Sequence, residues 1–436
     1  MSACEWKPDR SHDNFTPDQR AQVGPYYRHR PMLRINKSKY TNGPQLSIMT
    51  YNILSPCTKE QYPISHFTRE QIILFEIVRY NPDIVCLQEV NDHHRWIERF
   101  AMFGYNMRVF CPNEFHAVAI AYKWDLFQEF DHKKVHFRRT QTGYIRERRP
   151  SSQGALFLCL TFKPEFLIGR NTPTKDAIII GTAHLPLTGV KAFGRTRDTI
   201  ALFDAVYRFA RDLTRHWKPD FEFYSFIAGD FNATPEDPAY QALVTNPVKF
   251  TGKARKTLLH SIAEDASADL QDQLDFSFWS LSSQYIYGDK LSSRNFGIFS
   301  DEWPDASDLV EELEGLLGDT DRRALSLYSA GYKLVDKENT QLGSDEPFYS
   351  YWGKYCRQLV DYIFVVPTTD DWEHWVPTKN NKLKNIHEFS QTTHLRILAL
   401  LQMPLRDDPE LQGIDQPNVG QFPSDHICMM ADLELL

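Results

Sequence analysis

Eight acidic, amide and histidine side chains in this 436-residue sequence stand at the ends of short apolar runs. They are Asn52, Glu89, His184, Asp230, Asn232, Asp361, Asp425 and His426. Carboxylates bind hard divalent cations such as Mg²⁺, and a histidine beside a carboxylate can orient and move protons. Amide and imidazole N–H groups can donate to a phosphate. Together these side chains could supply what hydrolysis of a phosphoester requires: a bound cation, a positioned water and hydrogen-bond donors.

Each of these residues also has an ordinary structural explanation. A carboxylate at the end of a strand can cap a helix, and a single histidine is more often a structural side chain than a catalyst. Asp230 and Asn232 share the segment Gly-Asp-Phe-Asn, and Asp425 and His426 end Ser-Asp-His. The functional interpretation therefore requires the fold to bring all eight side chains to one place.

The apolar runs have the composition of buried strands and alternate with helical periodicity, which indicates an α/β protein. We expect helices over 68–80, 199–214 and 307–317, and strands over 46–52, 83–89, 117–122, 155–162, 177–183, 223–227, 362–366 and 427–433. Open α/β sheets build their sites at the carboxyl ends of strands. We therefore expect the eight side chains along one rim of the fold.

The chain divides into two unequal parts. Residues 1–44 mix proline, glycine and basic residues without periodicity, so we expect an irregular N-terminal extension. Residues 45–436 are expected to form one catalytic domain, interrupted at about 252–325 by an acidic, serine-rich insertion.

The composition limits the class of protein. The longest apolar runs are too short to span a bilayer, and residues 1–20 lack the apolar core of a secretory signal. The seven cysteines form no CxxC pair and are expected to be reduced. We therefore expect a protein of the cytoplasm or nucleus that is not secreted and does not enter a membrane.

The basic residues are unevenly distributed in a chain whose formal net charge is −8. Proteins that bind nucleic acid usually place clustered Lys and Arg against phosphates. One cluster contains Lys133, Lys134, Arg138, Arg139, Arg146, Arg148 and Arg149. Two interpretations stay open for it: a solvated charged hairpin, or a surface that follows RNA phosphates through residues such as Arg146 and Arg148.

The motifs Tyr-Asn, Leu-Gln-Glu-Val, His-Leu, Gly-Asp-Phe-Asn, Asp-Tyr-Ile-Phe and Ser-Asp-His follow one another in this order. This series resembles the endonuclease/exonuclease/phosphatase superfamily, which includes DNase I. The resemblance implies a four-layer α/β sandwich, in which two packed mixed sheets are flanked by helices. It also implies Mg²⁺ as cofactor, with Mn²⁺ as a possible substitute.

The resemblance further implies a role for each residue of the motifs. Glu89 would be the main Mg²⁺ ligand, with Asn52 and Asp425 near the metal. Asp230 would orient or deprotonate the attacking water. The remaining residues would act on the phosphate, through donors from Asn232 and His184 and through His426, whose tautomer Asp361 would fix.

The flanking segments resemble one branch of this superfamily: carbon-catabolite-repressor-type deadenylases, nocturnin and the Angel proteins. The similar segments are the helix before Leu-Gln-Glu-Val, Glu-Pro-Phe-Tyr-Ser-Tyr-Trp before Asp361, and the tail ending in Phe-Pro-Ser-Asp-His. The resemblance implies a 3′-to-5′ exoribonuclease acting on single-stranded RNA 3′ ends. An RNA 2′,3′-cyclic phosphatase and a phosphatase of a small nucleotide or inositol phosphate stay open as alternatives.

The chain also departs from this branch. It has no leucine-rich repeat, so we expect no docking into a deadenylase complex by that route. Cys356 stands where several deadenylases carry a phenylalanine that stacks on adenine, which weakens the expectation of a strict poly(A) preference. Tyr351 and Tyr355 are nearby candidates for stacking on bases, and Arg197 is a candidate phosphate contact. A catalytically dead binding module is disfavoured because every motif residue is present.

Overall fold

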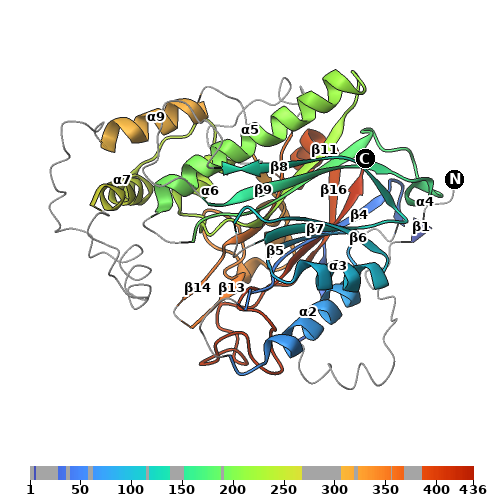
Figure 1. Cartoon of the computed structure of the whole chain (residues 1–436), viewed down its shortest axis with the longest axis horizontal. Helices are drawn as coiled ribbons and strands as arrows, with labels where there is room; N and C mark the ends of the chain where they lie inside the picture. Colours follow the sequence, from blue (N-terminus) through green and yellow to red (C-terminus); the bar gives the residue numbers. More distant parts are fainter. Residues whose placement is uncertain are drawn as a thin grey trace.

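The computed structural model describes eleven stretches of the chain: residues 4–5, 28–35, 40–56, 62–113, 117–137, 152–187, 191–267, 306–318, 323–354, 356–367 and 385–436. Within them two large sheets lie face to face, with helices on the outer side of each (Figure 1). The expected four-layer α/β sandwich is confirmed.

The first sheet has seven strands. Its order is β2 (Met32–Arg34), β16 (Leu395–Leu401), β17 (Met429–Leu435), β4 (Gln45–Asn52), β5 (Ile84–Val90), β7 (Ala117–Lys123) and β6 (Tyr105–Phe110). Strands β4 and β5 are parallel, and the other neighbours are antiparallel. Helices α2 (His66–Tyr80) and α3 (His93–Met102) lie along the outer face of this sheet (Figure 1).

The second sheet has six strands. Its order is β12 (Leu325–Ser326), β15 (Asp361–Val365), β11 (Phe223–Asp230), β10 (Ala177–His184), β9 (Gly154–Phe162) and β8 (Phe127–His136). Only β10 and β11 are parallel. The long helix α5 (Ala192–His216) and the short helix α6 (Pro238–Val244) cover its outer side (Figure 1).

The side chains of β4 alternate between two hydrophobic cores, one on each face of the sheet. Leu46 and Ile48 face the core between the two sheets, whereas Met49 and Tyr51 face the core under α2 and α3. Successive side chains of a strand point to opposite faces, so the near-continuous apolar run reflects burial on both sides. By the same alternation Asn52 points toward the space between the sheets, at their edge.

Smaller elements complete the fold. Two-stranded pairs are β1 (Cys4–Glu5) with β3 (Tyr40–Thr41) and β13 (Tyr351–Trp352) with β14 (Arg357–Gln358). The short helices are α4 (Pro164–Leu167), α10 (Leu327–Gly331), η5 (Tyr332–Leu334), η6 (Lys337–Asn339) and α11 (Ile386–Thr393). Among the described residues, no helix has the length and apolar character to cross a membrane.

The described parts of the expected N-terminal extension and acidic insertion form regular elements that pack on the domain. Residues 32–34 of the N-terminal segment form the edge strand β2, which pairs with β16. Helices α7 (Gly252–Ser267) and α9 (Ala306–Gly318) pack in a cluster that contains Leu258, Val310 and Leu313 and also takes in Phe193 of α5. The described parts of the acidic region thus extend the helical layer over α5.

Candidate active site

Three candidate residues lie side by side across adjacent strands of the six-stranded sheet. His184 of β10 is in register with Asp230 of β11, and Asp230 is in register with Asp361 of β15. The parallel strands β10 and β11 both end here, and the antiparallel β15 begins here. Gly229 permits this arrangement, because a Cβ at that position would lie 2.2 Å from the carbonyl oxygen of Ala183.

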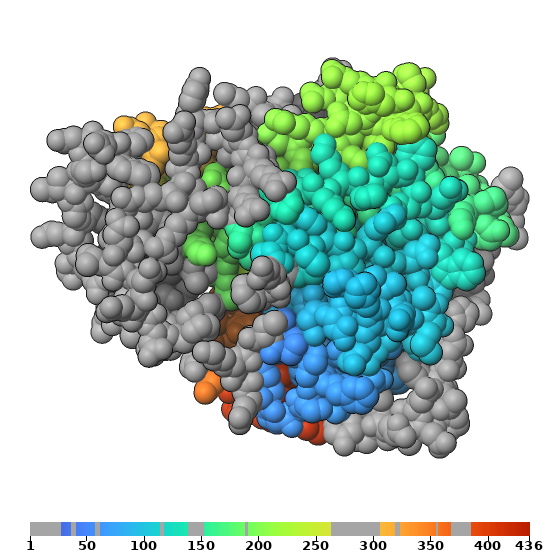
Figure 2. All heavy atoms as spheres, viewed as in Figure 1, coloured from blue at the N-terminus to red at the C-terminus, as the bar shows by residue number. Residues whose placement is uncertain are grey.

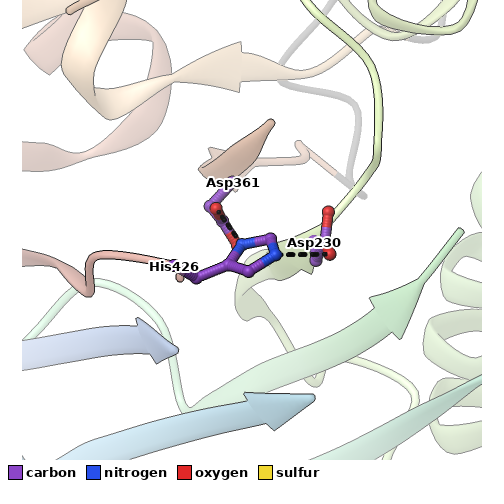
Figure 3. Close-up of side chains that lie close together, drawn as sticks. All are labelled: Asp230, Asp361 and His426. Carbon is purple, nitrogen blue, oxygen red and sulfur yellow. Dashed lines mark hydrogen bonds and ion pairs between the residues drawn. The ribbon is translucent and has the colours of Figure 1, made fainter. Parts of the chain in front are cut away.

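His426 reaches this row from the other sheet and lies between two carboxylates (Figure 3). Its Nδ1 is 2.9 Å from Oδ2 of Asp361, and its Nε2 is 3.6 Å from Oδ2 of Asp230. Burial alone would lower the pKa of His426, but Asp361 and Asp230 outweigh it and raise the pKa well above its usual value. His426 is therefore an imidazolium at neutral pH, with Nδ1–H donating to Asp361.

Burial acts on the pKa of Asp230 in the opposite direction from its effect on His426. Its side chain is buried, and burial raises its pKa to about 7, although the positive charge of His426 opposes the rise. A carboxylate with a pKa near neutrality can accept a proton from water and release it again. His184 Nε2 lies 3.4 Å from Oδ2 of Asp230, and burial lowers the pKa of His184, which keeps that imidazole neutral.

A backbone connection holds His426 in place. Tyr351 forms an antiparallel bridge with His426, and the flanking bonds run from the Ile427 N–H to the Ser350 carbonyl (2.7 Å) and from the Trp352 N–H to the Asp425 carbonyl (2.8 Å). The hydroxyl of Ser350 donates to Oδ2 of Asp361 at 2.7 Å. The histidine and its carboxylate partner are thus fixed by the same short strand.

Glu89 reaches the site through a bulge in β5. Pairing between β5 and β7 shifts between Leu87 and Val90, and Glu89 has a left-handed φ of 57°. Regular alternation would point Glu89 outward with Val85 and Leu87, toward α2. A bulge re-aims one side chain, and here it turns the carboxylate of Glu89 toward Asn52.

Asn52 connects the two halves of the site. Its Nδ2 donates to Oε1 of Glu89 and to Oδ2 of Asp230, each at 3.0 Å. Its Oδ1 accepts from the N–H of Leu54 at 3.0 Å, which fixes the orientation of the amide. The nitrogen of Asn52 therefore faces the carboxylates of Glu89 and Asp230 and its oxygen faces the backbone. Its place in the metal site stays a prediction.

Asp425 is the second carboxylate on the Glu89 side. Burial raises the pKa of Asp425 to about 6, Glu89 adds to the rise, and His426 and Arg69 oppose it. A carboxylate whose pKa is raised by a second carboxylate marks a favourable place for a divalent cation, whose charge offsets their repulsion. The donor set of Glu89 and Asp425 thus fits an oxygen-ligated ion such as Mg²⁺.

The ligand atoms of Asp230, Asp361 and His426 also lie within 4.8 Å of one another. A metal-binding histidine is a neutral imidazole, whereas Nδ1 of His426 pairs with Asp361 and the two carboxylates raise the pKa of His426, which favours the protonated ring. This cluster is therefore suited to proton transfer, and the Glu89 side is suited to the metal.

Asn232 and Arg197 lie in surroundings that limit their roles. Asn232 has a left-handed φ of 47°, and its Nδ2 donates to the Leu185 carbonyl at 2.9 Å and more weakly to Asp230 at 3.4 Å. The weaker bond is the one that a phosphate could replace. Arg197 is buried on α5 and pairs with Asp198 at 3.1 Å.

The aromatic candidates separate into different groups. The ring of Tyr351 is half-buried and contacts the ring of His426 edge-on, with centroids 5.0 Å apart. Its neighbour Trp352 is buried, with the guanidinium of Arg357 4.3 Å from its ring centre, so it belongs to the core. Tyr355, Arg146 and Arg148 lie outside the described residues.

Sequence reasoning missed the residues that support the site from behind. Ser350 holds Asp361, the Ser55 N–H donates to Oε2 of Glu89 at 3.0 Å, and the Ser424 hydroxyl donates to the Asn52 carbonyl at 2.8 Å. Serine is common at strand ends, so its type carries no signal. The adjacency of Ser424 to Asp425 was the one available clue.

The chain is similar to known proteins in sequence and in fold. A model of the Endonuclease/Exonuclease/phosphatase family matches residues 49–426. RNA exonuclease NGL2 of Saccharomyces cerevisiae is 28% identical over 436 aligned residues, which cover 93% of this chain and 81% of NGL2.

Two solved structures share the fold. The human nocturnin catalytic domain with bound sulfate has a TM-score of 0.50 at 17% identity, covering 93% of this chain and 98% of that one. ANGEL2, a 2′,3′-cyclic phosphatase in complex with adenosine-2′,3′-vanadate, has a TM-score of 0.53 at 18% identity, covering 94% and 99%. The predicted resemblance is confirmed: the chain belongs to the endonuclease/exonuclease/phosphatase family and is a hydrolase of phosphate esters.

Proposed function

We propose that this protein is a Mg²⁺-dependent exoribonuclease that removes nucleotides from the 3′ end of single-stranded RNA. The observation that carries the proposal is the Asp361–His426–Asp230 series beside the carboxylates of Glu89 and Asp425. It combines a proton acceptor and a cationic donor with a cation site, which are the parts that phosphodiester hydrolysis requires.

In the proposed site Glu89 and Asp425 hold Mg²⁺, which Mn²⁺ can replace, and Asn52 orients Glu89 through its amide. When bound, the ion supplies Lewis acidity toward the scissile phosphate. The Ser55 N–H and the Asn52 amide leave Glu89 little freedom to rotate. The protein therefore presents the carboxylate in one orientation before any substrate arrives.

The protein groups on the other side act on water and phosphate. Asp230 accepts a proton from the attacking water, for which its pKa near neutrality is suited. His426 donates from Nε2 toward the phosphate while Asp361 holds Nδ1. His184 and Asn232 add donors beside Asp230 as negative charge develops on the phosphate oxygens.

RNA as the substrate is supported by the relatives. NGL2 is named an RNA exonuclease and aligns along most of this chain. Tyr351 stands at the site, where its ring can contact a terminal base. We propose Arg197, Tyr355, Arg146 and Arg148 as further RNA contacts. The substrate is then recognised through stacking and phosphates, without an implied preference for poly(A).

The test uses 5′-labelled RNAs that end in poly(A), in mixed sequence or in a 2′,3′-cyclic phosphate, with Mg²⁺ or with EDTA. We expect a ladder of shortened RNAs that requires Mg²⁺. Conversion of the cyclic end without shortening would favour a cyclic phosphatase, the activity named for ANGEL2. Unchanged RNA in every reaction would instead point to a small nucleotide or inositol phosphate.

A further inference from the structure

One buried arginine contacts the backbone of two loops beside the Glu89 carboxylate, the loop after Asn52 and the loop before Asp425. Arg69 lies on α2 and is 2% exposed. Its Nη1 donates to the carbonyls of Ile53 (3.3 Å) and Pro423 (3.0 Å), and its Nη2 donates to the carbonyl of Leu54 (2.7 Å). Ile53 and Leu54 follow Asn52, and Pro423 comes two residues before Asp425.

The first of these loops has a strained turn that orients two site residues. Leu54 has a left-handed φ of 53°, which is unfavourable for a side chain of this kind. Its N–H donates to Oδ1 of Asn52 at 3.0 Å, and the next N–H, of Ser55, donates to Oε2 of Glu89 at 3.0 Å. The bond from Arg69 to the Leu54 carbonyl therefore stabilises the turn from which Asn52 and Glu89 are held.

The second loop is joined to the first at two points. Arg69 bonds the Pro423 carbonyl, and the Ser424 hydroxyl donates to the Asn52 carbonyl at 2.8 Å. These loops lie far apart in the sequence. Figure 2 shows that residues of α2 (blue) and of the C-terminal part (red) adjoin at the lower edge of this face. Arg69 thus fixes the separation between Asn52 and Asp425 from beneath the surface.

We propose that Arg69 is a positioning residue for the divalent cation: it holds the loop after Asn52, which orients Glu89, and the loop of Asp425 at the spacing that the ion requires. The inference rests on the proposed metal site. Charge-assisted bonds to backbone carbonyls are stronger than neutral ones, and a planar guanidinium can reach several acceptors at fixed angles. Loss of partners behind metal ligands typically lowers metal affinity about 10- to 100-fold.

Because Arg69 is positively charged, the direction in which its removal changes Mg²⁺ affinity distinguishes a positioning role from a purely electrostatic one. Burial lowers the pKa of Arg69, and the carboxylates of Asp425 and Glu89 oppose that change, so the guanidinium lies within their field. A nearby positive charge repels a cation. If Arg69 acted only through its charge, its removal would tighten Mg²⁺ binding, whereas loss of its positioning role weakens it.

The experiment titrates Mg²⁺ into the metal-free full chain by isothermal titration calorimetry, with no RNA present. We expect Arg69→Met to raise the Mg²⁺ dissociation constant about 10- to 100-fold. Arg69→Lys keeps the charge but not the planar set of donors, so we expect a rise of at least about tenfold. The lysine variant carries the test if the methionine variant does not fold.

Arg396→Met is the matched control. Arg396 pairs with the buried Glu434 at the opposite end of β17 from Asp425, so its loss should lower thermal stability in EDTA but leave the Mg²⁺ dissociation constant unchanged. Unchanged or tighter Mg²⁺ binding by both Arg69 variants would overturn the positioning role. A wild-type chain that binds no Mg²⁺ would overturn the proposed metal site, and this inference with it.

Discussion

Replacing Asp361 with asparagine removes the negative charge beside His426 and preserves the shape of the side chain at position 361. Oδ2 of Asp361 lies 2.9 Å from Nδ1 of His426, and the two side chains are 2% and 7% exposed. Removing one partner of a buried ion pair costs about 3 to 5 kcal/mol. If that loss falls on the transition state, turnover drops about 100- to 5,000-fold.

The pH dependence of turnover in this variant provides a second test of the pairing between Asp361 and His426. Asp361 helps to raise the pKa of His426, so its removal lowers that pKa and reduces the protonated fraction of the imidazole at a given pH. Acidification raises the protonated fraction of His426 more in the variant than in the wild type, whose pKa Asp361 already raises. We therefore expect the ratio of wild-type to variant rates to narrow as the pH falls from about 8 to about 5.5.

The assay is single-turnover cleavage of 5′-labelled RNA with saturating enzyme and Mg²⁺, with RNA affinity measured separately by fluorescence anisotropy. Affinity should stay near that of the wild type. Ser350→Ala is the control, because it removes the hydroxyl that donates to Asp361 and accepts from the Val360 and Asp361 N–H groups but keeps the charge of Asp361. We expect it to slow turnover less than Asp361→Asn does, because the ion pair with His426 remains. Unchanged turnover in Asp361→Asn, or an equal loss at both pH values, would refute the pairing.

Three further changes test other parts of the molecule. Glu89→Ala should abolish Mg²⁺-dependent cleavage while the unfolding free energy changes by less than about 1 kcal/mol, since the carboxylate lies at a partly solvated rim; a much larger loss in thermal melts would indicate a structural role. Burial raises the pKa of Glu346 from 4.5 to about 7, so the native state binds the extra proton and stability falls by about 3 kcal/mol as the pH rises through this window. Urea unfolding of Glu346→Gln should lack that fall, and parallel wild-type and variant profiles would contradict it. Tyr351→Ala should weaken RNA binding by about 1 to 3 kcal/mol in anisotropy titrations, and unchanged affinity would place the ring outside the RNA path.

The sequence predicted the six-stranded half of the site well for a simple reason. His184, Asp230 and Asp361 each stand at the end of a buried strand, and the register of β10, β11 and β15 aligns them. Apolar runs identify such strands. Parallel pairing brings the carboxyl ends of β10 and β11 to one edge, and the antiparallel strand β15 begins at that edge with Asp361.

Other features could not be predicted from local patterns. The direction of the Glu89 side chain depends on a bulge and a left-handed φ, and neither produces a periodic pattern in the sequence. Strand β8 alternates exposed and partly buried residues at the edge of its sheet, and its charged side chains left both a solvated hairpin and an RNA-binding surface open from the sequence. Arg69 acts on backbone carbonyls 15 and 354 residues away, and such contacts exist only after folding.

The central claim is Mg²⁺-dependent hydrolysis from the 3′ end of RNA, and one paired reaction tests it most directly. The same RNA is labelled either at its 3′-terminal nucleotide or at its 5′ end and is incubated with wild-type protein, with Mg²⁺ or with EDTA. We expect the 3′ label to appear first as a mononucleotide while the 5′-labelled RNA shortens stepwise, and both changes should stop in EDTA. Retention of the 3′ label on long RNA, or equal cleavage in EDTA, would contradict the assignment.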